Sequence, residues 1–495
     1  MKRKIGIALK CIFFILLVAV ILLGASKVLR RKGSLYKYAD FFDLAKKDQI
    51  DVLFLGSSHV INAVNPAVLY NEYGYTSYNM GGHGSLLQAT YWELMEALQY
   101  TTPEWVVVDA YMLEKDYRYL DDRDSNPDAD EVNTSIEQLH LNMDVWPLNK
   151  VKADAVDDLI QDKDLKREFL YDFIVYHNRW EYMTEDDFRS VVGHESRNEL
   201  FGAEMRYDVE TSIVKSDDPI DESMMPKVTV GEQYLGRIIE ECQNRGIGVL
   251  VTFDPFNPEV KDKIAAITAG EIAKAYGVPY LNMLDEDVID IYSDLNDRGH
   301  LNVVGAHKTT DKIGEWLSAN TDLIDHRSDE KYGYWEKLSN NYYDSIKDRT
   351  LQERNLFAKL NLLSLGEYGY VLYCNNGSQV FTDKPMERLI KGIAGSPAIQ
   401  NTSGPYILIK DPGFGKTYEA SWDERIDGAE TALGVLNYQP VEENFRLLYD
   451  VEDEDNNYLY DEDHPLEDIQ LLIYDKSTGE VLQHEFYTSK GGNYD

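Results

Sequence analysis

The strongest constraint on the fold is an alternation of strand and helix patterns from residue 50 to about residue 320. Residues 51–56 form a short apolar run that ends in glycine, as a buried parallel strand does. Strands alternating with helices through right-handed crossovers form a parallel sheet covered on both faces. The sequence therefore predicts a flavodoxin-like three-layer α/β/α domain over residues 48–320, with functional groups beyond the carboxyl ends of its strands. The other predicted strands are 105–109, 246–253 and 278–281, and the predicted helices are 85–100, 230–244, 261–276 and 303–317.

Two other parts of the chain depart from this alternation. Residues 115–228 are polar and lack a continuous apolar face, so we expect a helical insertion that overhangs the site. Residues 321–362 are charged and rich in tyrosine, and they predict a helical connector. Residues 363–495 predict a separate β-rich domain, because Gly, Asn and Asp turns alternate there with short apolar runs at 370–373, 406–409 and 471–474.

The N-terminal segment has the composition of a membrane-spanning helix. Residues 5–24 are apolar except for Lys10, and about 20 such residues cross a hydrocarbon core. The basic residues 2–4 favour a cytoplasmic N-terminus. We therefore expect residues 1–32 to be a cytoplasmic tip and a single-pass anchor, with the rest of the chain outside the cell membrane. The alternative is a signal peptide cleaved at the small residues 24–26.

The charge and the cysteines exclude several classes of function. Residues 1–37 hold nine of the 49 basic residues and no acid, so the rest of the chain carries 40 basic and 87 acidic residues. A body this acidic repels phosphate backbones, which argues against a nucleic-acid partner. The three cysteines are Cys11, Cys242 and Cys374, and their spacing gives neither a disulfide framework nor a CxxC metal site. We predict no metal and no other cofactor.

Three segments carry side chains suited to catalysis. Gly-Ser-Ser-His at 56–59 follows the first strand, where a glycine-led turn into a helix exposes a side chain beside backbone N–H groups. Asn-Met-Gly-Gly-His-Gly at 79–84 contains glycines that let the backbone approach a reacting oxygen. Asp-Arg-Gly-His-Leu-Asn at 297–302 stands just ahead of the last predicted helix. The joint order of the three segments, each near the end of a predicted element, indicates one common site.

These segments predict a catalytic triad. Ser58 is the expected nucleophile, and His300 is the base that takes its proton. Asp297 is expected to orient the imidazole and to stabilise its charged form.

The order of a serine block, a glycine-rich turn and Asp-x-x-His-Leu-Asn resembles the SGNH (GDSL-like) hydrolase superfamily over residues 50–320. The Gly-Ser-Ser-His opening is similar to its membrane-anchored bacterial branch, which includes alginate-type O-acetyltransferases and the D-alanyl-lipoteichoic-acid transfer protein. The resemblance implies the catalytic roles given above. The family's Gly-x-Asn-Asp block is missing, and Asp109 stands at its expected place. The oxyanion donors expected in its stead are the backbone N–H groups of Ser58 and Gly81, together with Asn79.

Four further residues are candidates for substrate binding. His177 and Arg179 lie close together in the insertion, where they could hold a carboxylate, a phosphate or a sugar hydroxyl. The alternative for them is a surface helix that packs through its tryptophan. His59 and His83 flank the expected catalytic segments, and each is expected either to line the site or to make a structural hydrogen bond.

The C-terminal runs 369–372 and 472–481 resemble the interleukin-like EMT inducer module, which implies a carbohydrate-binding role. Taken together, the resemblances imply an extracytoplasmic serine esterase or O-acyltransferase that adds or removes acyl groups, most simply acetyl, on a surface or exported polysaccharide. A transferase would need a polytopic membrane partner that exports acyl groups. Two alternatives remain open: D-alanyl transfer to teichoic acid, and a catalytically inactive glycan-binding or assembly protein.

Overall fold

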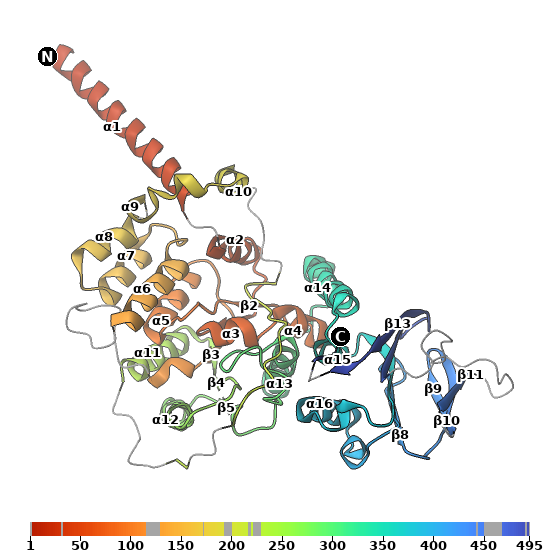
Figure 1. Cartoon of the computed structure of the whole chain (residues 1–495). Helices are drawn as coiled ribbons and strands as arrows, with labels where there is room; N and C mark the ends of the chain where they lie inside the picture. Colours follow the sequence, from red (N-terminus) through yellow and green to blue (C-terminus); the bar gives the residue numbers. More distant parts are fainter. Residues whose placement is uncertain are drawn as a thin grey trace. The chain divides into compact units, whose positions relative to one another are not determined.

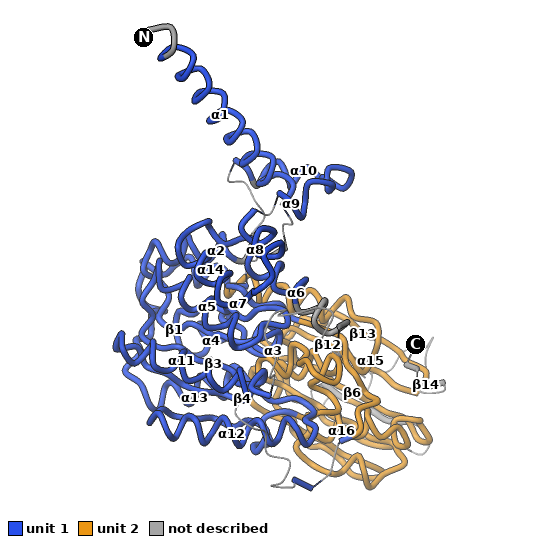
Figure 2. The backbone as a smooth tube through the Cα atoms, turned by 90° about the vertical axis from the view of Figure 1, so that its left-hand side faces the viewer, with its two compact units in different colours: residues 1–205, 215–289, 308–338 blue, residues 206–214, 290–307, 339–495 orange. Residues whose placement is uncertain are grey.

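The computed structural model describes residues 2–30, 33–114, 129–171, 173–192, 200–215, 219–220, 229–441, 444–449, 468–490 and 493–494. The chain divides into two compact units (Figure 2). Unit 1 comprises residues 1–205, 215–289 and 308–338, and unit 2 comprises residues 206–214, 290–307 and 339–495. The parallel sheet lies in unit 1, and the antiparallel sheets lie in unit 2.

Unit 1 is built on a five-stranded sheet in which every strand pair is parallel, as the sequence predicts. The strand order is β2-β1-β3-β4-β5, which is the flavodoxin-like order. The chain passes from β1 to β2 on one side and then to β3 on the other, so the order reverses beside β1. Ligand sites in such sheets lie at this reversal, beyond the carboxyl ends of the strands. The strands are β1 (Val52–Leu55), β2 (Ser77–Asn79), β3 (Trp105–Asp109), β4 (Gly248–Phe253) and β5 (Tyr280–Asn282).

Helices lie on both sides of this sheet (Figure 1). One side carries α5 (Leu87–Ala97), α11 (Val230–Arg245) and α12 (Val260–Tyr276), which pack against one another in that order. The other side carries α3 (Ser58–Ala63), α4 (Pro66–Tyr73) and α13 (Val303–Asn320). Of α13, the residues from 308 onward belong to unit 1. Local signals fix the helix ends: the Thr229 hydroxyl accepts the Glu232 N–H at the start of α11, and Gly246 ends that helix in the left-handed conformation.

Within the predicted insertion (115–228), the described residues 129–192 are mainly helical, whereas residues 200–215 have no regular secondary structure. Its elements are α6 (Ala129–Met143), α7 (Lys150–Leu159), α8 (Lys163–Leu170), α9 (Phe173–Tyr176), η2 (Arg179–Tyr182), α10 (Glu185–Arg189) and η3 (Ser190–Val192). The following segment, residues 200–205, returns to the sheet, where the Asn79 N–H donates to Phe201 O at 2.8 Å.

The N-terminus forms α1 (Lys2–Leu29), and α2 (Gly33–Ala45) follows it. Within α1, Ile5–Leu29 is long and apolar enough to cross a membrane, with a mean hydropathy of 3.0 for its most apolar window. It is the one such helix in the part of the chain that the structure describes. The predicted apolar N-terminal helix is confirmed, and it is consistent with a membrane anchor.

Unit 2 contains a separate antiparallel β domain, which confirms the β-rich prediction. A five-stranded sheet has the order β13-β12-β6-β7-β8, and a three-stranded sheet has the order β11-β10-β9. The strands are β6 (Tyr368–Cys374), β7 (Tyr406–Asp411), β8 (Lys416–Ser421), β9 (Ile426–Thr431), β10 (Gly434–Val441), β11 (Asn444–Tyr449), β12 (Ile469–Asp475) and β13 (Val481–Tyr487), followed by the two-residue strands β14 (Ser489–Lys490) and β15 (Asn493–Tyr494).

Both faces of the five-stranded sheet are buried. Along β6, Tyr370 and Leu372 join one core cluster, whereas Val371 and Tyr373 join the other, because side chains alternate across a strand. The first cluster includes residues of two helices, α15 (Leu356–Leu363) and α16 (Lys384–Ala394), and the second includes residues of β9, β10 and β11. The predicted connector, residues 321–362, contains α14 (Gly333–Gln352). It also contains most of α15, but residues of α15 belong to the first cluster, so this helix is a core element of the β domain.

Candidate active site

The turn after β1 presents Ser58. Gly56 has a φ of +153°, and a Cβ there would come within 2.6 Å of a methyl carbon of Val60, so the turn requires glycine. The Ser57 hydroxyl accepts the His59 N–H at 3.3 Å and caps α3. Ser57 and His59 are buried, whereas Ser58 is half-buried at the first position of α3. Of the two adjacent serines, the local fold therefore displays Ser58 and uses Ser57 as a helix cap.

The turn after β2 corrects the prediction for Asn79. Its Nδ2 donates to Val60 O at 2.7 Å and to Val64 O at 2.8 Å, so both amide protons are used inside the fold. Its Oδ1 accepts the Gly81 N–H at 3.0 Å. Asn79 is fully buried and ties the turn after β2 to α3, and it has no proton left for an oxyanion. The Gly81 N–H donates to the same side chain, so it too is used inside the fold.

The structure brings Asp297 and His300 together in the loop before α13. The Nδ1 atom of His300 lies 2.9 Å from Oδ1 and 3.0 Å from Oδ2 of Asp297. The Asp297 Oδ1 atom also accepts the N–H groups of Gly299 and His300. An antiparallel bridge between Leu295 and Leu301 closes the loop. The carboxylate is thus held in place by its own loop and faces the Nδ1 side of the imidazole.

Arg206, which lies outside the predicted motifs, also contacts Asp297. The Arg206 guanidinium donates to Asp297 Oδ2 at 2.8 Å, and Arg206 O accepts the Val303 N–H at 2.7 Å. Partial burial raises the pKa of Asp297, but the Gly299 N–H, His300 and the Arg206 charge outweigh it and lower that pKa below its ordinary value. Asp297 therefore stays ionised throughout the neutral range, as a residue that stabilises an imidazolium must.

Replacing Arg206 with glutamine should destabilise unit 2 by less than about 1 kcal/mol at pH 7, since both partners are partly exposed. A carboxyl whose pKa is lowered by folding adds stability above its unfolded pKa, near 4, and loses it as the pH falls through the folded pKa. The difference between Arg206→Gln and the parent should therefore shrink below about pH 4. Thermal unfolding across pH measures it. Arg425→Gln, an exposed change in the same unit, is the control, and an equal pH trend in both variants would contradict the assignment.

The predicted triad is divided between the two units. Ser58 belongs to unit 1, whereas Asp297 and His300 belong to unit 2. The structure brings Asp297 and His300 together and defines the surroundings of Ser58. The pairing of Ser58 with His300 stays a prediction.

Directly behind the Ser58 turn lies a pair of buried carboxyls. Asp109 ends β3, Asp254 follows β4, and the Asp254 N–H donates to Asp109 Oδ1 at 3.2 Å. A Cβ on Gly56 would lie 3.1 Å from the Asp109 Cβ. Burial, then the charge of Asp254, raises the pKa of Asp109 well above its ordinary value. Burial raises the pKa of Asp254 to about 7, against a smaller opposite effect of the Thr252 hydroxyl.

Asp254 lies outside the motifs that predict the site, although its position in the sequence is a usable signal. Asp254 directly follows the predicted strand 246–253, Asp109 ends the predicted strand 105–109, and Ser58 lies two residues after the predicted strand 51–56. The carboxyl ends of neighbouring parallel strands meet at one edge of a sheet. Beside this pair, the His59 ring stacks on Tyr111 with centroids 3.5 Å apart and meets the edge of Phe256. His59 is thus a buried wall of the Ser58 turn.

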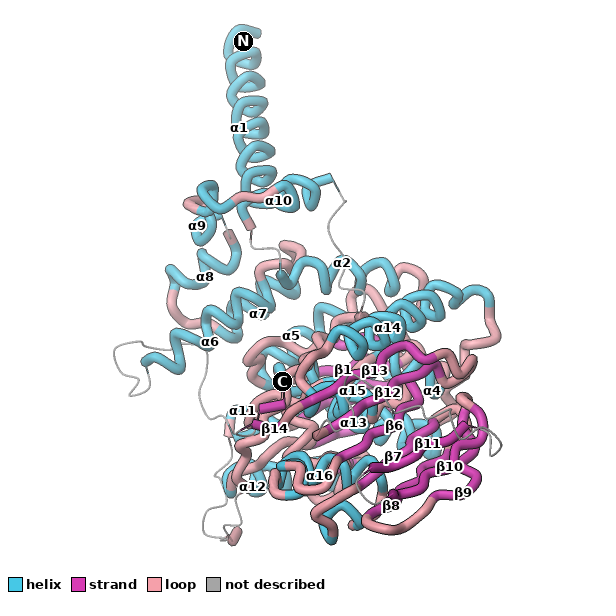
Figure 3. The backbone as a smooth tube through the Cα atoms, turned by 45° about the vertical axis from the view of Figure 1, so that its right-hand side comes forward, coloured by secondary structure: helices cyan, strands magenta, loops and turns pink. Residues whose placement is uncertain are grey.

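The remaining candidate residues fall in two places in unit 1. His83 lies near the β2 turn, where its Nε2 is 3.3 Å from Glu204 Oε1. Arg179 donates to the carbonyl oxygens of Leu29 and Arg30 at the end of α1, and the exposed His177 pairs its Nδ1 with Ile174 O. Because α9 lies beside α1 in Figures 1 and 3, away from α3, Arg179 has a structural contact in place of the predicted substrate contact.

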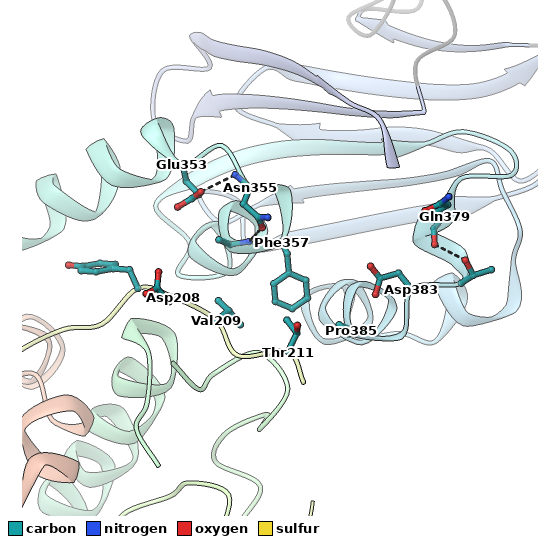
Figure 4. Close-up of a pocket in the computed structure, with 12 residues that line it drawn as sticks. Asp208, Val209, Thr211, Glu353, Asn355, Phe357, Gln379, Asp383 and Pro385 are labelled. Atoms are coloured by element: carbon teal, nitrogen blue, oxygen red, sulfur yellow. Dashed lines mark hydrogen bonds between the residues drawn. The ribbon is translucent and has the colours of Figure 1, made fainter. Parts of the chain in front are cut away.

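Unit 2 also contains a cleft of about 690 Å³ (Figure 4). One wall is residues 207–211, which follow Arg206, and the other wall is the start of α15 together with residues 379–385. Tyr207 contributes an aromatic face, with the Arg349 guanidinium 3.8 Å from its ring centroid. The rest of the lining combines hydroxyl and amide groups with three carboxylates and four apolar side chains. The carboxylates are Asp208, Glu353 and Asp383, and the apolar residues are Val209, Phe357, Ala358 and Pro385.

Comparison with known proteins finds no protein-family model that matches the chain, and no significant match among curated proteins. Among the residues that the structure describes, no group of three His, Cys, Asp or Glu side chains is placed to hold a metal ion.

Proposed function

We propose that this chain is an SGNH-type serine esterase or O-acyltransferase, held by α1 in a bacterial cell membrane with its body outside. The observation that carries the proposal is the Asp297–His300 pair. An imidazole that donates from Nδ1 to a carboxylate carries its lone pair on Nε2, and it can then take a proton from a serine hydroxyl. Ser58, displayed after β1 at the reversal of strand order, is the serine that we assign to it.

The proposed reaction has two halves. The Ser58 Oγ attacks the acyl carbonyl while His300 Nε2 accepts the hydroxyl proton, and the Ser58 N–H stabilises the oxyanion. The leaving alcohol departs with the proton from His300, and an acyl ester remains on Ser58. Water or a sugar hydroxyl then gives its proton to His300 and attacks that ester, and His300 returns the proton to the Ser58 Oγ as the acyl bond breaks. Hydrolysis and transfer differ only in this second acceptor.

A polysaccharide is the substrate that the cleft of unit 2 favours. Its wall begins at Tyr207, one residue after the arginine that holds Asp297, so a chain bound there lies along the segment that supports the triad acid. Aromatic faces bind sugar rings, and hydroxyl, amide and carboxyl groups accept or donate hydrogen bonds to sugar hydroxyls. Removal or transfer of acetyl groups on an exported polysaccharide fits this lining.

Replacing Tyr207 with alanine should raise KM for an acetylated polysaccharide about fivefold, the loss of roughly 1 kcal/mol from one aromatic contact. The kcat/KM for a small chromogenic acetyl ester should stay within about twofold, because that ester does not reach the cleft. Trp422→Ala removes an exposed aromatic ring of the same unit outside the cleft and should change neither value. Equal losses on both substrates would contradict a polymer-binding role.

A fluorophosphonate probe tests the nucleophile directly, because it forms a covalent bond only with an activated serine. In the full chain the probe should label Ser58, as located by peptide mass spectrometry. The His300→Ala variant should label far more slowly, since its serine has no base. Labelling at another serine, or equal labelling without His300, would overturn the proposal. Adding an oligosaccharide acceptor to an acetyl donor then distinguishes transfer from hydrolysis.

A further inference from the structure

The residues after α8 lie against the C-terminal end of α1. We call residues 173–192 the collar; it comprises α9, η2, α10 and η3 (Figures 1 and 3). The elements α9, α10 and η3 all contact α1. Arg179 Nη1 donates to Leu29 O at 2.5 Å and to Arg30 O at 2.6 Å, which satisfies carbonyl groups that end a helix. The collar is therefore fastened to the end of the apolar helix.

The collar has an interior that holds its shape. Asp187 is almost fully buried, and its carboxylate accepts from Arg179 at 3.3 Å and from the Thr184 N–H at 2.7 Å. Arg179, which donates to the end of α1, is thus itself hydrogen-bonded to Asp187 within the collar. These internal hydrogen bonds hold the backbone that carries the exposed apolar residues of the collar.

Large apolar side chains point outward from the collar. A soluble surface seldom gathers so many in one short segment. Tryptophan and tyrosine are the residues that concentrate at membrane interfaces, where one part of the ring is in apolar surroundings and another in water. The exposed side chains, with their exposed fractions, are Ile174 (47%), Trp180 (62%), Tyr182 (73%), Phe188 (55%), Val191 (39%) and Val192 (69%).

The length of α1 places the collar at the level of the lipid headgroups. Residues 5–23 are exposed except for Gly6, and at 1.5 Å per residue they span about 28 Å, close to the thickness of a hydrocarbon core. Beyond them, Ser26 and Leu29 are buried within unit 1. If residues 5–23 cross the hydrocarbon, the contacts between α1 and the collar begin where it ends.

We propose that the collar inserts its apolar side chains into the headgroup layer of the bilayer that α1 crosses, and so sets unit 1 directly on the membrane surface. The proposal rests on α1 being retained as an anchor, but not on which side of the membrane the body lies. Charges of both signs occur in the collar, and Arg189 pairs with Glu185 at 2.8 Å. Apolar insertion, and not attraction to anionic lipid, is therefore the main source of binding.

Nitroxide labels on the full chain in phosphatidylcholine nanodiscs test this placement. Single cysteines are introduced by Phe188→Cys and Val192→Cys in a Cys11→Ser background, since Cys242 and Cys374 are buried. Ile267→Cys is the matched control: it is an exposed apolar position on α12, at the end of unit 1 far from α1 in Figures 1 to 3. Leu16→Cys, in the middle of α1, reports the anchor itself.

Labels at positions 188 and 192 should be several-fold more accessible to oxygen, relative to a water-soluble nickel complex, than the label at 267. Nanodiscs with phosphatidylglycerol should give the same pattern. Aqueous accessibility at 188 and 192 equal to that at 267, with position 16 in lipid, would overturn the collar proposal alone. A label at position 16 that is accessible from water would overturn the retained anchor on which the proposal depends.

Discussion

Replacing Ser58 with alanine should lower turnover of a chromogenic acetyl ester by a factor of about 10³ or more, the usual effect of removing a serine nucleophile. The fold should survive, because Ser58 is half-buried at the first position of α3 and alanine suits a helix there. Turnover is measured on purified full-length chain, and circular dichroism checks the fold.

The neighbouring serine is the matched control. The Ser57 hydroxyl accepts the His59 N–H as the cap of α3, so Ser57→Ala should cost about 1 kcal/mol of stability. Its turnover should remain close to that of the parent chain. Full turnover in Ser58→Ala would rule out the nucleophile. A parent chain that binds acetylated glycan but turns over no ester would favour the inactive glycan-binding alternative.

Replacing Asp254 with asparagine should stabilise unit 1 at pH 8 by on the order of 3 kcal/mol. Burial raises the pKa of Asp254 to about 7 in the folded chain, whereas an unfolded aspartate titrates near 4. Between these values the unfolded chain has lost the proton and the folded chain keeps it, so the parent loses stability as the pH rises from about 4 to about 7. Asparagine resembles the protonated acid and carries no such loss.

Hydrogen exchange of peptides that contain β3 and β4 measures this effect within unit 1. Exchange in the parent should speed up, after correction for intrinsic rates, as the pH rises from 5 to 8. Exchange in Asp254→Asn should speed up less, because only Asp109 then remains as a buried acid with a raised pKa. Asp287→Asn removes an exposed carboxylate of the same unit and should behave like the parent. A variant less stable than the parent at pH 8 would mean that the Asp109–Asp254 pair is ionised and held by contacts that asparagine cannot make.

Much of the sheet could be predicted because buried strands leave simple patterns. The run at 246–253 is mainly apolar and begins with Gly246, the glycine that ends a helix, and the structure places β4 at Gly248–Phe253. The exposure of Ser58 at the end of a strand was predictable in the same way, because it follows an apolar run that ends in Gly56. The Asp297–His300 contact was predictable because three residues of separation on one tight turn bring the two side chains together.

Contacts that depend on strand order or on irregular segments were not predictable. The meeting of Asp109 and Asp254 requires β3 beside β4, which local patterns do not give. Arg206 lies in a segment with no periodicity, so nothing in the sequence assigned it to Asp297. The amide of Asn79 could be a donor to substrate or to the backbone, and only the positions of Val60 and Val64 decide between them.

The hydrogen bonds from Arg179 to the end of α1 bear on how the proposed anchor and the collar move together. Leu29 O and Arg30 O both accept from this guanidinium, at 2.5 Å and 2.6 Å, so the collar is joined directly to α1. If α1 crosses the bilayer as proposed, a tilt imposed by a thicker or thinner bilayer should carry the collar with it. The depth to which the collar enters the headgroup layer would then depend on bilayer thickness.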